Sequence, residues 1–399
     1  MKDKISIIQF MPYFPPHKWW VETVWEEIWK YWIKNKLWNL INIVTEFDQR
    51  KFIKNDNIIF YKWEEIWYYN DWYEILVVPS IEIINNFPVY KIWSKKYKLI
   101  IEYLLWKIST EYNSFRVITH TRFFLTSLIW WLFAFNNNIK WVHIEHWSDY
   151  VKLSSKIKSY ISFVYDKIIW NWIFQKADIV LAISNACKEF INRDFTNRNI
   201  NIFYRWIDFS NNIIETEILS KKFRWKKIIW YIWRLYKWKN VESLINAYYL
   251  LDDNIKNNYQ LVIVWDWEDF KRLKKMNIDN SIYFTWWKSF WEALSYQKQF
   301  DIHVHPSSPW GWLATTILQA MNLWCMIVAT PNEGAREVII DNKNWFLLKN
   351  DSIEEINRWI NRAILNLGSS ENFKKENKKN IEEKFSWKNN IFTLYNLIK

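Results

Sequence analysis

Two cations stand where an apolar run gives way to a helical segment in the second half of the chain. Residues 229–242 read IWYIWRLYKWKNVE, so Arg234 and Lys239 lie between a predicted strand and the start of a predicted helix. The amides and the dipole of a helix N-terminus combine with such cations to bind an anion, above all a phosphate group. A solvated basic turn is the alternative interpretation of this segment.

The tryptophan and glycine contents of the chain are unusual. Its 399 residues include 33 Trp and 3 Gly, whereas about 7% of an ordinary protein is glycine. Many Trp follow apolar runs or prolines at turns, where the backbone needs a positive φ or must approach a ligand closely; they include Trp19, Trp20, Trp265, Trp267, Trp310 and Trp312.

We therefore expect most of these Trp to stand at glycine positions, as they would if the gene uses UGA as a glycine codon and was translated with UGA as Trp. The Trp side chains should then crowd turns or lie exposed at loop tips, where they cannot be buried. A genuinely aromatic-rich chain is the alternative.

Short apolar strands alternate with helices along the chain. In the first half we expect strands at 5–10, 40–45, 74–78, 116–119, 140–144 and 177–183, with helices at 21–34 and 185–194. In the second half we expect strands at 228–232, 260–264, 282–284, 302–305 and 326–329, with helices at 241–251, 268–276, 315–321, 353–366 and 371–383. This alternation predicts parallel sheets of βαβ units, whose ligands bind beyond the carboxyl ends of the strands. The break between the two series, near residues 206–225, predicts two Rossmann-like domains.

Charge and cysteine content narrow the function classes. The net charge of +12 is spread along the chain without a long basic run or a nucleic-acid-binding motif, so we expect no nucleic-acid partner. Cys187 and Cys325 fit no metal or redox spacing and indicate buried thiols in a reducing compartment. The N-terminal apolar run is too short for a signal peptide, and the longest one, 125–135, is too short for a membrane span. We expect a soluble, cytoplasmic protein.

Several of these segments resemble those of the retaining glycosyltransferases of family 4, if Trp is read as Gly at turn positions. Residues 233–240 resemble the family's G-R-L-x-x-x-K-G, and residues 265–267 resemble its G-D-G. Residues 306–321 resemble P-S-x-x-E-G-L-x-T-x-x-L-E-A-M. Residues 15–22 resemble P-P-x-x-G-G-V-E, and residues 204–208 resemble the link N-G-I-D. The resemblance covers nearly the whole chain.

The resemblance implies an α/β protein of GT-B fold, in which two Rossmann-like, doubly wound domains face a central cleft. Residues 1–205 would form the domain on the acceptor side. Residues 206–380 would form the domain that binds the nucleotide sugar. Residues 381–399 would form a C-terminal helix that packs back towards the first domain.

The resemblance also assigns roles to single residues. Arg234 and Lys239 would neutralise the pyrophosphate of the donor and act in catalysis. Trp20, read as Gly, would let loop amides approach the donor. His120 would lie near the transferred sugar, where a neutral imidazole can bind a hydroxyl group. Two further histidines are candidates on the acceptor side, and a structural loop histidine is their alternative role: His17 and His146.

The chain departs from the family at a pair of glutamates that lie eight residues apart, one near the donor sugar and one on the ribose. Gly311 and Gln319 stand at these positions. An amide can still bind ribose hydroxyls, whereas the sugar contact at Gly311 is lost or taken over by the backbone amides of Leu313, Ala314 and Thr315. In the next strand-end loop, Glu333 is a candidate to compensate.

The resemblance therefore implies an enzyme of the 2.4 class that moves a sugar from a nucleotide-diphosphate donor to a glycan or lipid-linked acceptor of cell-envelope polysaccharide, with retention of configuration. We expect no cofactor and no metal, and no Asp-x-Asp metal motif occurs. A lipid-linked acceptor would bring the basic first domain to the anionic inner face of the membrane. A nucleotide-sugar epimerase of GT-B fold and a non-catalytic, nucleotide-binding scaffold are the alternative functions.

Overall fold

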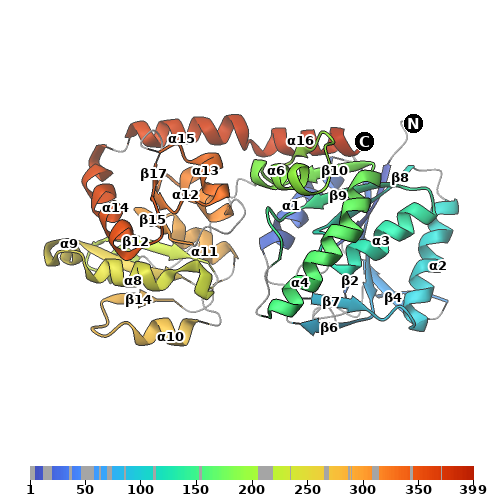
Figure 1. The fold of residues 1–399 in the computed structure, drawn as a ribbon, viewed down its shortest axis with the longest axis horizontal. Helices are drawn as coiled ribbons and strands as arrows, with labels where there is room; N and C mark the ends of the chain where they lie inside the picture. Colours follow the sequence, from blue (N-terminus) through green and yellow to red (C-terminus); the bar gives the residue numbers. More distant parts are fainter. Residues whose placement is uncertain are drawn as a thin grey trace. The chain divides into compact units, whose positions relative to one another are not determined.

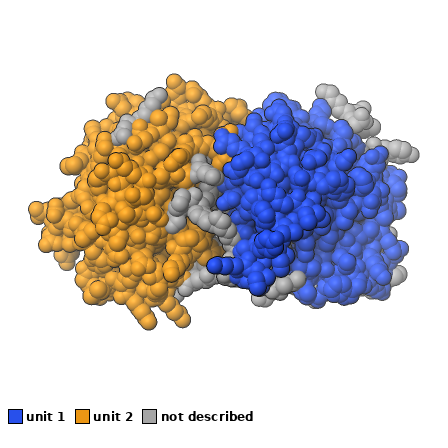
Figure 2. Space-filling view, in the orientation of Figure 1, with its two compact units in different colours: residues 1–183, 187–205, 391–399 blue, residues 184–186, 206–390 orange. Residues whose placement is uncertain are grey.

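The computed structural model divides the chain into two compact units (Figure 2). The first comprises residues 1–183, 187–205 and 391–399, and the second comprises 184–186 and 206–390. The residues described are 5–11, 20–35, 38–45, 58–62, 64–69, 74–84, 87–110, 114–151, 155–204, 219–233, 235–264, 269–285, 288, 290–307, 314–341, 345–369 and 371–399. The expected domain boundaries, after residues 205 and 380, stay a prediction.

The described part of the first unit is built on a nine-stranded sheet, in the order β11-β10-β9-β8-β1-β2-β5-β4-β3 (Figure 1). Its strands are β1 (Ile5–Phe10), β2 (Trp38–Thr45), β3 (Ile58–Tyr61), β4 (Glu64–Tyr69), β5 (Glu74–Val78), β8 (Ser114–His120), β9 (Lys140–Glu145), β10 (Ile179–Ala182) and β11 (Asn201–Ile202). Pairing is parallel from β11 to β5, and β4 and β3 add an antiparallel edge. A separate hairpin pairs β6 (Ser80–Ile84) with β7 (Phe87–Tyr90). Because helices cover a parallel sheet on both faces, its strands are rich in apolar residues. In the fully buried β1, the two polar residues are Ser6 and Gln9.

The helices of the first unit are α1 (Trp20–Lys34), α2 (Lys95–Thr110), α3 (Leu125–Asn136), α4 (Lys156–Tyr165), the π-helical η3 (Asp166–Trp170), α5 (Asn171–Lys176) and α6 (Asn185–Asp194). The C-terminal helix α16 (Trp387–Ile398) ends in this unit. The Arg116 side chain fixes that end, because its Nε donates to the carbonyl oxygen of Ile398 at 3.2 Å and its Nη2 donates to that of Lys399 at 2.9 Å.

The described part of the second unit holds a six-stranded parallel sheet in the order β14-β13-β12-β15-β16-β17. Its strands are β12 (Lys227–Ile232), β13 (Tyr259–Val264), β14 (Ile282–Phe284), β15 (Ile302–His305), β16 (Met326–Ala329) and β17 (Phe346–Leu347). Its helices are α7 (Leu219–Lys222), η4 (Lys237–Lys239), α8 (Val241–Tyr249), α9 (Asp253–Asn258), α10 (Phe270–Lys275), α11 (Phe290–Gln297), α12 (Thr315–Asn322), α13 (Glu333–Val338), α14 (Ile353–Asn366), η5 (Leu367–Ser369) and α15 (Glu371–Lys384).

Each sheet has a point at which its strand order reverses. In the first unit β1 lies between β2 and β8, and in the second β12 lies between β13 and β15. Such switch points leave a crevice beyond the carboxyl ends of the two diverging strands, and ligands of open α/β sheets bind there. The fold thus singles out the ends of β1 and β8 in one unit and of β12 and β15 in the other.

The expectation that Trp side chains crowd turns or loop tips is wrong for a group of Trp that lie in helices, in a strand or in an isolated β-bridge. Among the described residues, seven Trp are under 2% exposed: Trp25, Trp29, Trp32, Trp130, Trp170, Trp230 and Trp345. They are held between helices and sheets, where large apolar groups gain most from burial. The Trp that the sequence analysis named at turns leave the expectation untested there: Trp19, Trp265, Trp267, Trp310 and Trp312 lie outside the described residues, and the side chain of Trp20 is not described.

Two other Trp do occupy the backbone conformation that favours glycine. Trp225 has φ 67° and Trp324 has φ 65°, and both side chains are exposed. Trp324 follows the C-cap of α12, where its N–H donates to the carbonyl of Met321 at 3.3 Å and the next N–H, of Cys325, donates to that of Ala320 at 2.9 Å. This is the Schellman ending of a helix, in which the left-handed residue is usually glycine.

We predict that Trp324→Gly raises the free energy of unfolding by about 1 kcal/mol, because the left-handed conformation costs a residue with a Cβ about 1–2 kcal/mol and an exposed indole adds little packing. Urea denaturation measures the change. Trp106→Gly is the matched control: that indole is also exposed but lies inside α2, where glycine should lower stability by about 0.5 kcal/mol. If the free energy of unfolding changed with the same sign in both variants, this would contradict our conclusion that the backbone at position 324 favours glycine.

Candidate active site

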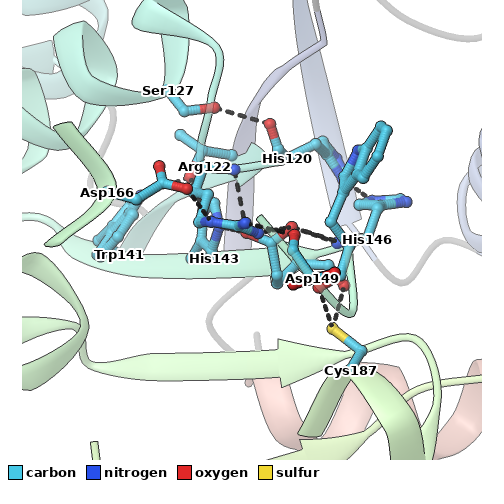
Figure 3. A network of polar contacts seen from close by, with 12 residues as sticks. His120, Arg122, Ser127, Trp141, His143, His146, Asp149, Asp166 and Cys187 are labelled. Carbon is cyan, nitrogen blue, oxygen red and sulfur yellow. Dashed lines mark hydrogen bonds and ion pairs between the residues drawn. The ribbon is translucent and has the colours of Figure 1, made fainter. Parts of the chain in front are cut away.

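His120 ends β8 and lies at the switch point of the first unit. The side chain is 3% exposed. Its Nε2 lies 2.9 Å from the amide nitrogen of Gln9, which comes from the neighbouring strand β1. Its Nδ1 lies 3.1 Å from Nε2 of His146, which follows β9 (Figure 3). The parallel register of the three strands brings these side chains together.

The proton positions follow from the donors. The amide nitrogen of Gln9 is a donor, so Nε2 of His120 accepts and its ring proton lies on Nδ1. That proton is then donated to Nε2 of His146. The ring of Trp25, from α1, packs against His120 edge-on, with centroids 4.7 Å apart. Both ring nitrogens of His120 are therefore engaged inside the protein, and the structure brings together two of the histidines that the sequence singles out.

A buried charge cluster lies beside this pair, and the sequence analysis missed it. Arg122 follows His120 by two residues, and its Nη1 lies 3.3 Å from Oε1 of Glu145, the residue that precedes His146. Its Nε donates to Oδ2 of Asp166 at 2.9 Å. All three charged side chains of the cluster are fully buried. Charged residues at or just after the ends of apolar strands were the signal that could have found Arg122 and Glu145.

Two opposing effects set the pKa values in the cluster: burial disfavours the charged form of a group, and pairing with an opposite charge favours it. Burial raises the pKa of Asp166 to about 6, although the Arg122 guanidinium opposes this rise. Burial also acts on Glu145, but Arg122, His143 and a backbone amide together hold the pKa of its carboxyl below the usual value. Burial lowers the pKa of His143, so this ring is neutral. One guanidinium cannot fully compensate two buried carboxylates, and the proton goes to Asp166.

Lys239 lies at the switch point of the second unit, in the turn between β12 and α8. It is 4% exposed, and burial lowers the pKa of its ammonium to about 7. No carboxylate of the described residues forms an ion pair with it. Its Nζ instead lies 4.1 Å from the ring centroid of Trp238 and 5.9 Å from that of Trp233. The next residue, Asn240, has φ 53° and precedes α8.

His305, at the end of β15, lies on the other side of this switch point. Burial and the nearby charge of Lys239 hold the pKa of His305 well below the usual value. Its Nε2 lies 3.1 Å from Oγ of Ser307. A neutral imidazole and a buried ammonium thus lie near each other at the carboxyl ends of β12 and β15.

The start of α12 and its buried amide complete the described candidates of this unit. Ala314 is the N-cap and provides no side-chain hydrogen bond to the helix, which leaves the amides of its first turn without a side-chain cap. Thr315 begins the helix and is 9% exposed. Gln319 is 2% exposed, and its Oε1 accepts from Nε2 of Gln297 at 3.2 Å. Only the amide nitrogen of Gln319 therefore keeps its full capacity for a ligand.

Other candidates from the sequence lie outside the described residues: His17, Arg234, Gly311 and Leu313. Trp20 begins α1 and Glu333 begins α13, and the placement of their side chains is not described. Within the ranges that are described, no cluster of three or more His, Cys, Asp or Glu side chains could hold a metal ion. No helix in those ranges is long and apolar enough to cross a bilayer.

Known proteins resemble this chain in sequence and in fold. A family model described as glycosyl transferases group 1 matches residues 215–380. An uncharacterized glycosyltransferase of Methanocaldococcus jannaschii is 38% identical over 401 residues, covering 97% of this chain and 96% of the relative. Sucrose-phosphate synthase from Thermosynechococcus elongatus superposes with a TM-score of 0.74 at 13% identity, over 99% of this chain and 98% of the other. HepE of Anabaena, in complex with UDP and glucose, does so with a TM-score of 0.72 at 14% identity, over 98% of each chain. The expected GT-B fold is confirmed.

The buried cluster yields a prediction for stability against pH. The pKa of Asp166 is about 6 in the folded protein, against 3.8 as its ordinary value, so the folded state holds this proton more tightly than the unfolded state. Stability from this group is therefore present at low pH and lost as pH rises towards 6. Relative to Asp166→Asn, the free energy of unfolding of the parent protein should fall by about 2 kcal/mol between pH 4 and pH 7.

Urea denaturation at several pH values measures this difference, and parallel profiles for the two proteins would contradict it. Asp194→Asn is the matched control, since Lys167 and Arg193 lower the pKa of that carboxyl against the effect of burial. There the parent protein should lose stability relative to the variant as pH falls, which is the opposite sign.

Proposed function

Because the chain belongs to the glycosyl transferases of group 1, we propose that it transfers a hexosyl or related sugar from a nucleotide-diphosphate donor to a glycan or lipid-linked acceptor. We assign it to the retaining family 4, on its motifs. We propose that the diphosphate binds beyond β12 and β15 in the second unit. The complex of HepE with UDP and glucose supports a nucleotide sugar as donor.

The observation that carries this proposal is the buried, uncompensated charge of Lys239. Removing an ammonium from water costs several kcal/mol unless an opposite charge accompanies it, and no carboxylate of the described second unit does so. A diphosphate would supply that charge, and the ammonium would regain its usual pKa. Arg234, five residues earlier, is the second cation of the proposed site.

The uncapped start of α12 supports the same ligand. Amides of Ala314 and Thr315 can donate to a phosphate or to the donor sugar, because an anion at a helix N-terminus is stabilised by the free N–H groups and the dipole. Gly311 and Leu313 precede this helix in the sequence. The amide nitrogen of Gln319 would donate to a ribose hydroxyl. Recognition by backbone amides would replace the carboxylate that Gly311 lacks.

The reaction needs no metal in this proposal. As the bond from the sugar to the diphosphate breaks, negative charge grows on the leaving oxygen, and Lys239 and Arg234 stabilise that charge. The leaving oxygen accepts the proton of the attacking hydroxyl on the same face of the sugar, so the configuration is retained. His120 would orient the sugar through a hydroxyl group that takes the place of Gln9 or His146 as a hydrogen-bond partner of its ring. His17 and His146 would face the acceptor.

We further propose that glycine replaces a subset of the Trp in protein made by the native host. Trp225 and Trp324 support this through their positive φ. Trp25, Trp29 and Trp345 support it differently: these buried indoles have no acceptor for their N–H, which buried Trp usually find. The indoles of Trp130, Trp141 and Trp359 do have acceptors and are our candidates for genuine Trp. Peptide mass spectrometry of native protein decides each position.

The donor site is tested by UDP binding in a chain that carries Trp233→Gly and Trp238→Gly, which uncovers the ammonium. Lys239→Ala in this background should weaken binding by about 1.5–3 kcal/mol, the worth of a charged hydrogen bond. Lys237→Ala is the matched control, because this neighbouring lysine is exposed, and affinity should hardly change. Titration calorimetry measures both. Equal affinities for the two variants would place the phosphate elsewhere.

Titration of the parent chain with UDP, in which Trp233 and Trp238 still lie against Lys239, gives a pH dependence. Since the pKa of Lys239 is about 7 without ligand and rises when a diphosphate pairs with it, binding should take up a proton above pH 7. UDP affinity should therefore fall from pH 7 to pH 9, and Lys239→Ala should remove this fall.

The products formed from a UDP-sugar distinguish the three candidate functions. A transferase releases UDP, an epimerase yields an isomeric nucleotide sugar without releasing UDP, and a non-catalytic scaffold leaves the nucleotide sugar unchanged.

An exposed apolar face on α4 and η3 supports our proposal that the enzyme works at the inner face of an anionic membrane. Exposed fractions are 74% for Ile157, 68% for Tyr160, 62% for Ile161 and 65% for Ile168. Their spacing of three, four and seven residues puts them on one side of the helix. Two exposed lysines, Lys156 and Lys158, adjoin these apolar residues. The helix α4 contains no acidic residue. Apolar and basic groups together are typical of helices that lie in a bilayer surface.

Co-sedimentation with vesicles that contain phosphatidylserine tests this face. The double variant Ile157→Asp/Ile161→Asp should lose most of the binding, and higher ionic strength should weaken binding by the parent protein. The matched control is Leu365→Asp, a change at an apolar residue of the second unit that is 83% exposed; it should bind normally. Equal loss in both variants, or equal binding to neutral phosphatidylcholine vesicles, would exclude α4 as the membrane face.

A further inference from the structure

The Glu145 carboxylate ties together the two loops that carry His120 and His146. Its Oε2 accepts from the backbone N–H of Arg122, in the loop after β8, at 3.0 Å. Its Oε1 accepts from the backbone N–H groups of His146 and Trp147, in the loop after β9, each at 2.9 Å. One buried carboxylate thus fixes the backbone on both sides of the histidine pair.

The surroundings of Glu145 keep this carboxylate charged and in place. The guanidinium of Arg122 faces Oε1, and Nε2 of His143 lies 3.3 Å from Oε2. Nδ1 of His143 in turn lies 2.9 Å from Oγ1 of Thr119. Arg122 also donates from Nη2 to the carbonyl of Asp149 at 2.7 Å, which anchors the far end of the second loop. Charged acceptors bind amides more strongly than neutral ones.

Backbone strain at Thr121 indicates that this arrangement is held against a cost. Thr121 separates His120 from Arg122 and has φ 63°, a conformation that a β-branched residue rarely adopts. Its N–H donates to the carbonyl of Ile144 at 3.0 Å. Strained residues of this kind persist where the surroundings determine them, and they cluster at functional sites.

We propose that Glu145 is a positioning residue that sets the orientation and the protonation state of His120. Its hold on the backbone of His146 aims Nε2 of that ring at Nδ1 of His120, and the contact keeps the His120 proton on Nδ1. This inference rests on the proposed function for its importance in sugar transfer, since His120 is the residue assigned to the sugar. Its structural part concerns the histidine pair alone.

The test is nitrogen NMR of protein labelled with ¹⁵N-histidine, which is readable because the chain has six histidines. In the parent protein His120 should be the Nδ1–H tautomer. Among the described residues, the groups that face the pair include Gln9, the ring of Trp25 and, beyond the backbone of residue 146, Glu145 with Arg122 and His143. Glu145→Gln should leave a mixture of His120 tautomers. The neutral amide has one acceptor oxygen for the three N–H groups, so the contact between His146 and His120 is weakened. Gln9 can then turn its amide and accept from an Nε2–H of His120 with its Oε1, which has no partner in the structure.

Asp178→Asn is the matched control. Asp178 also accepts a backbone N–H from β9, that of Trp141 at 2.8 Å, but at the opposite end of the strand. This variant should leave the His120 signals unchanged. If Glu145→Gln also leaves them unchanged, the proposal is overturned. If Glu145→Gln fails to fold, the NMR spectrum of the parent protein still tests the proposal. An Nε2–H tautomer of His120 in that spectrum would contradict it.

Kinetics separate this inference from the proposed function. With a UDP-sugar as donor, Glu145→Gln should lower kcat by about tenfold or more with little change in the KM for the donor, since misplaced groups slow the chemical step. A parent protein that transfers no sugar would overturn the proposed function and leave the NMR result valid. Normal kcat in Glu145→Gln, together with an altered tautomer, would overturn the positioning role.

Discussion

Charge removed from water is the constraint on which both candidate sites depend. In the first unit a buried guanidinium is faced by two carboxylates, so the cluster around Arg122 is complete without a ligand. In the second unit a buried ammonium lacks a carboxylate among the described residues, so the surroundings of Lys239 favour an anion. The first arrangement holds loops in place, and the second is suited to binding. Burial alone would not distinguish them, because both cations are nearly inaccessible.

The sequence predicted the parallel strands well, because buried strands of a parallel sheet are continuous apolar runs. It did not predict the antiparallel edge formed by β3 and β4, where EEIWYY mixes charged and aromatic residues. It also missed α2 and α3, and the helix α3 is so apolar (LTSLIWWLFAFN) that no amphipathic period marks it. In each case contacts with the rest of the unit decide the structure, and a local pattern does not contain them.

The candidate site was predictable where it follows one strand and unpredictable where it joins several. Lys239 was identified at the start of a predicted helix that follows an apolar strand, and His120 was identified through the family resemblance, directly after an apolar strand. The contact of His120 with Gln9 and His146 needs the register of three strands, which spans more than a hundred residues. Arg122 and Asp166 lie 44 residues apart, and Asp166 sits in a π-helical turn that no sequence period announces. Pairing of distant charges was the information that the sequence lacked.

The backbone before α8 has a consequence for production of the protein in a foreign host. Asn240 adopts a left-handed conformation at the last position of the segment that resembles G-R-L-x-x-x-K-G, and asparagine tolerates that conformation. Asparagine codons are read alike whether UGA is decoded as glycine or as tryptophan. This turn, which leads the chain from the buried ammonium into its helix, is therefore the same in either decoding, whereas Trp233 and Trp238 would be glycine only under the decoding proposed above.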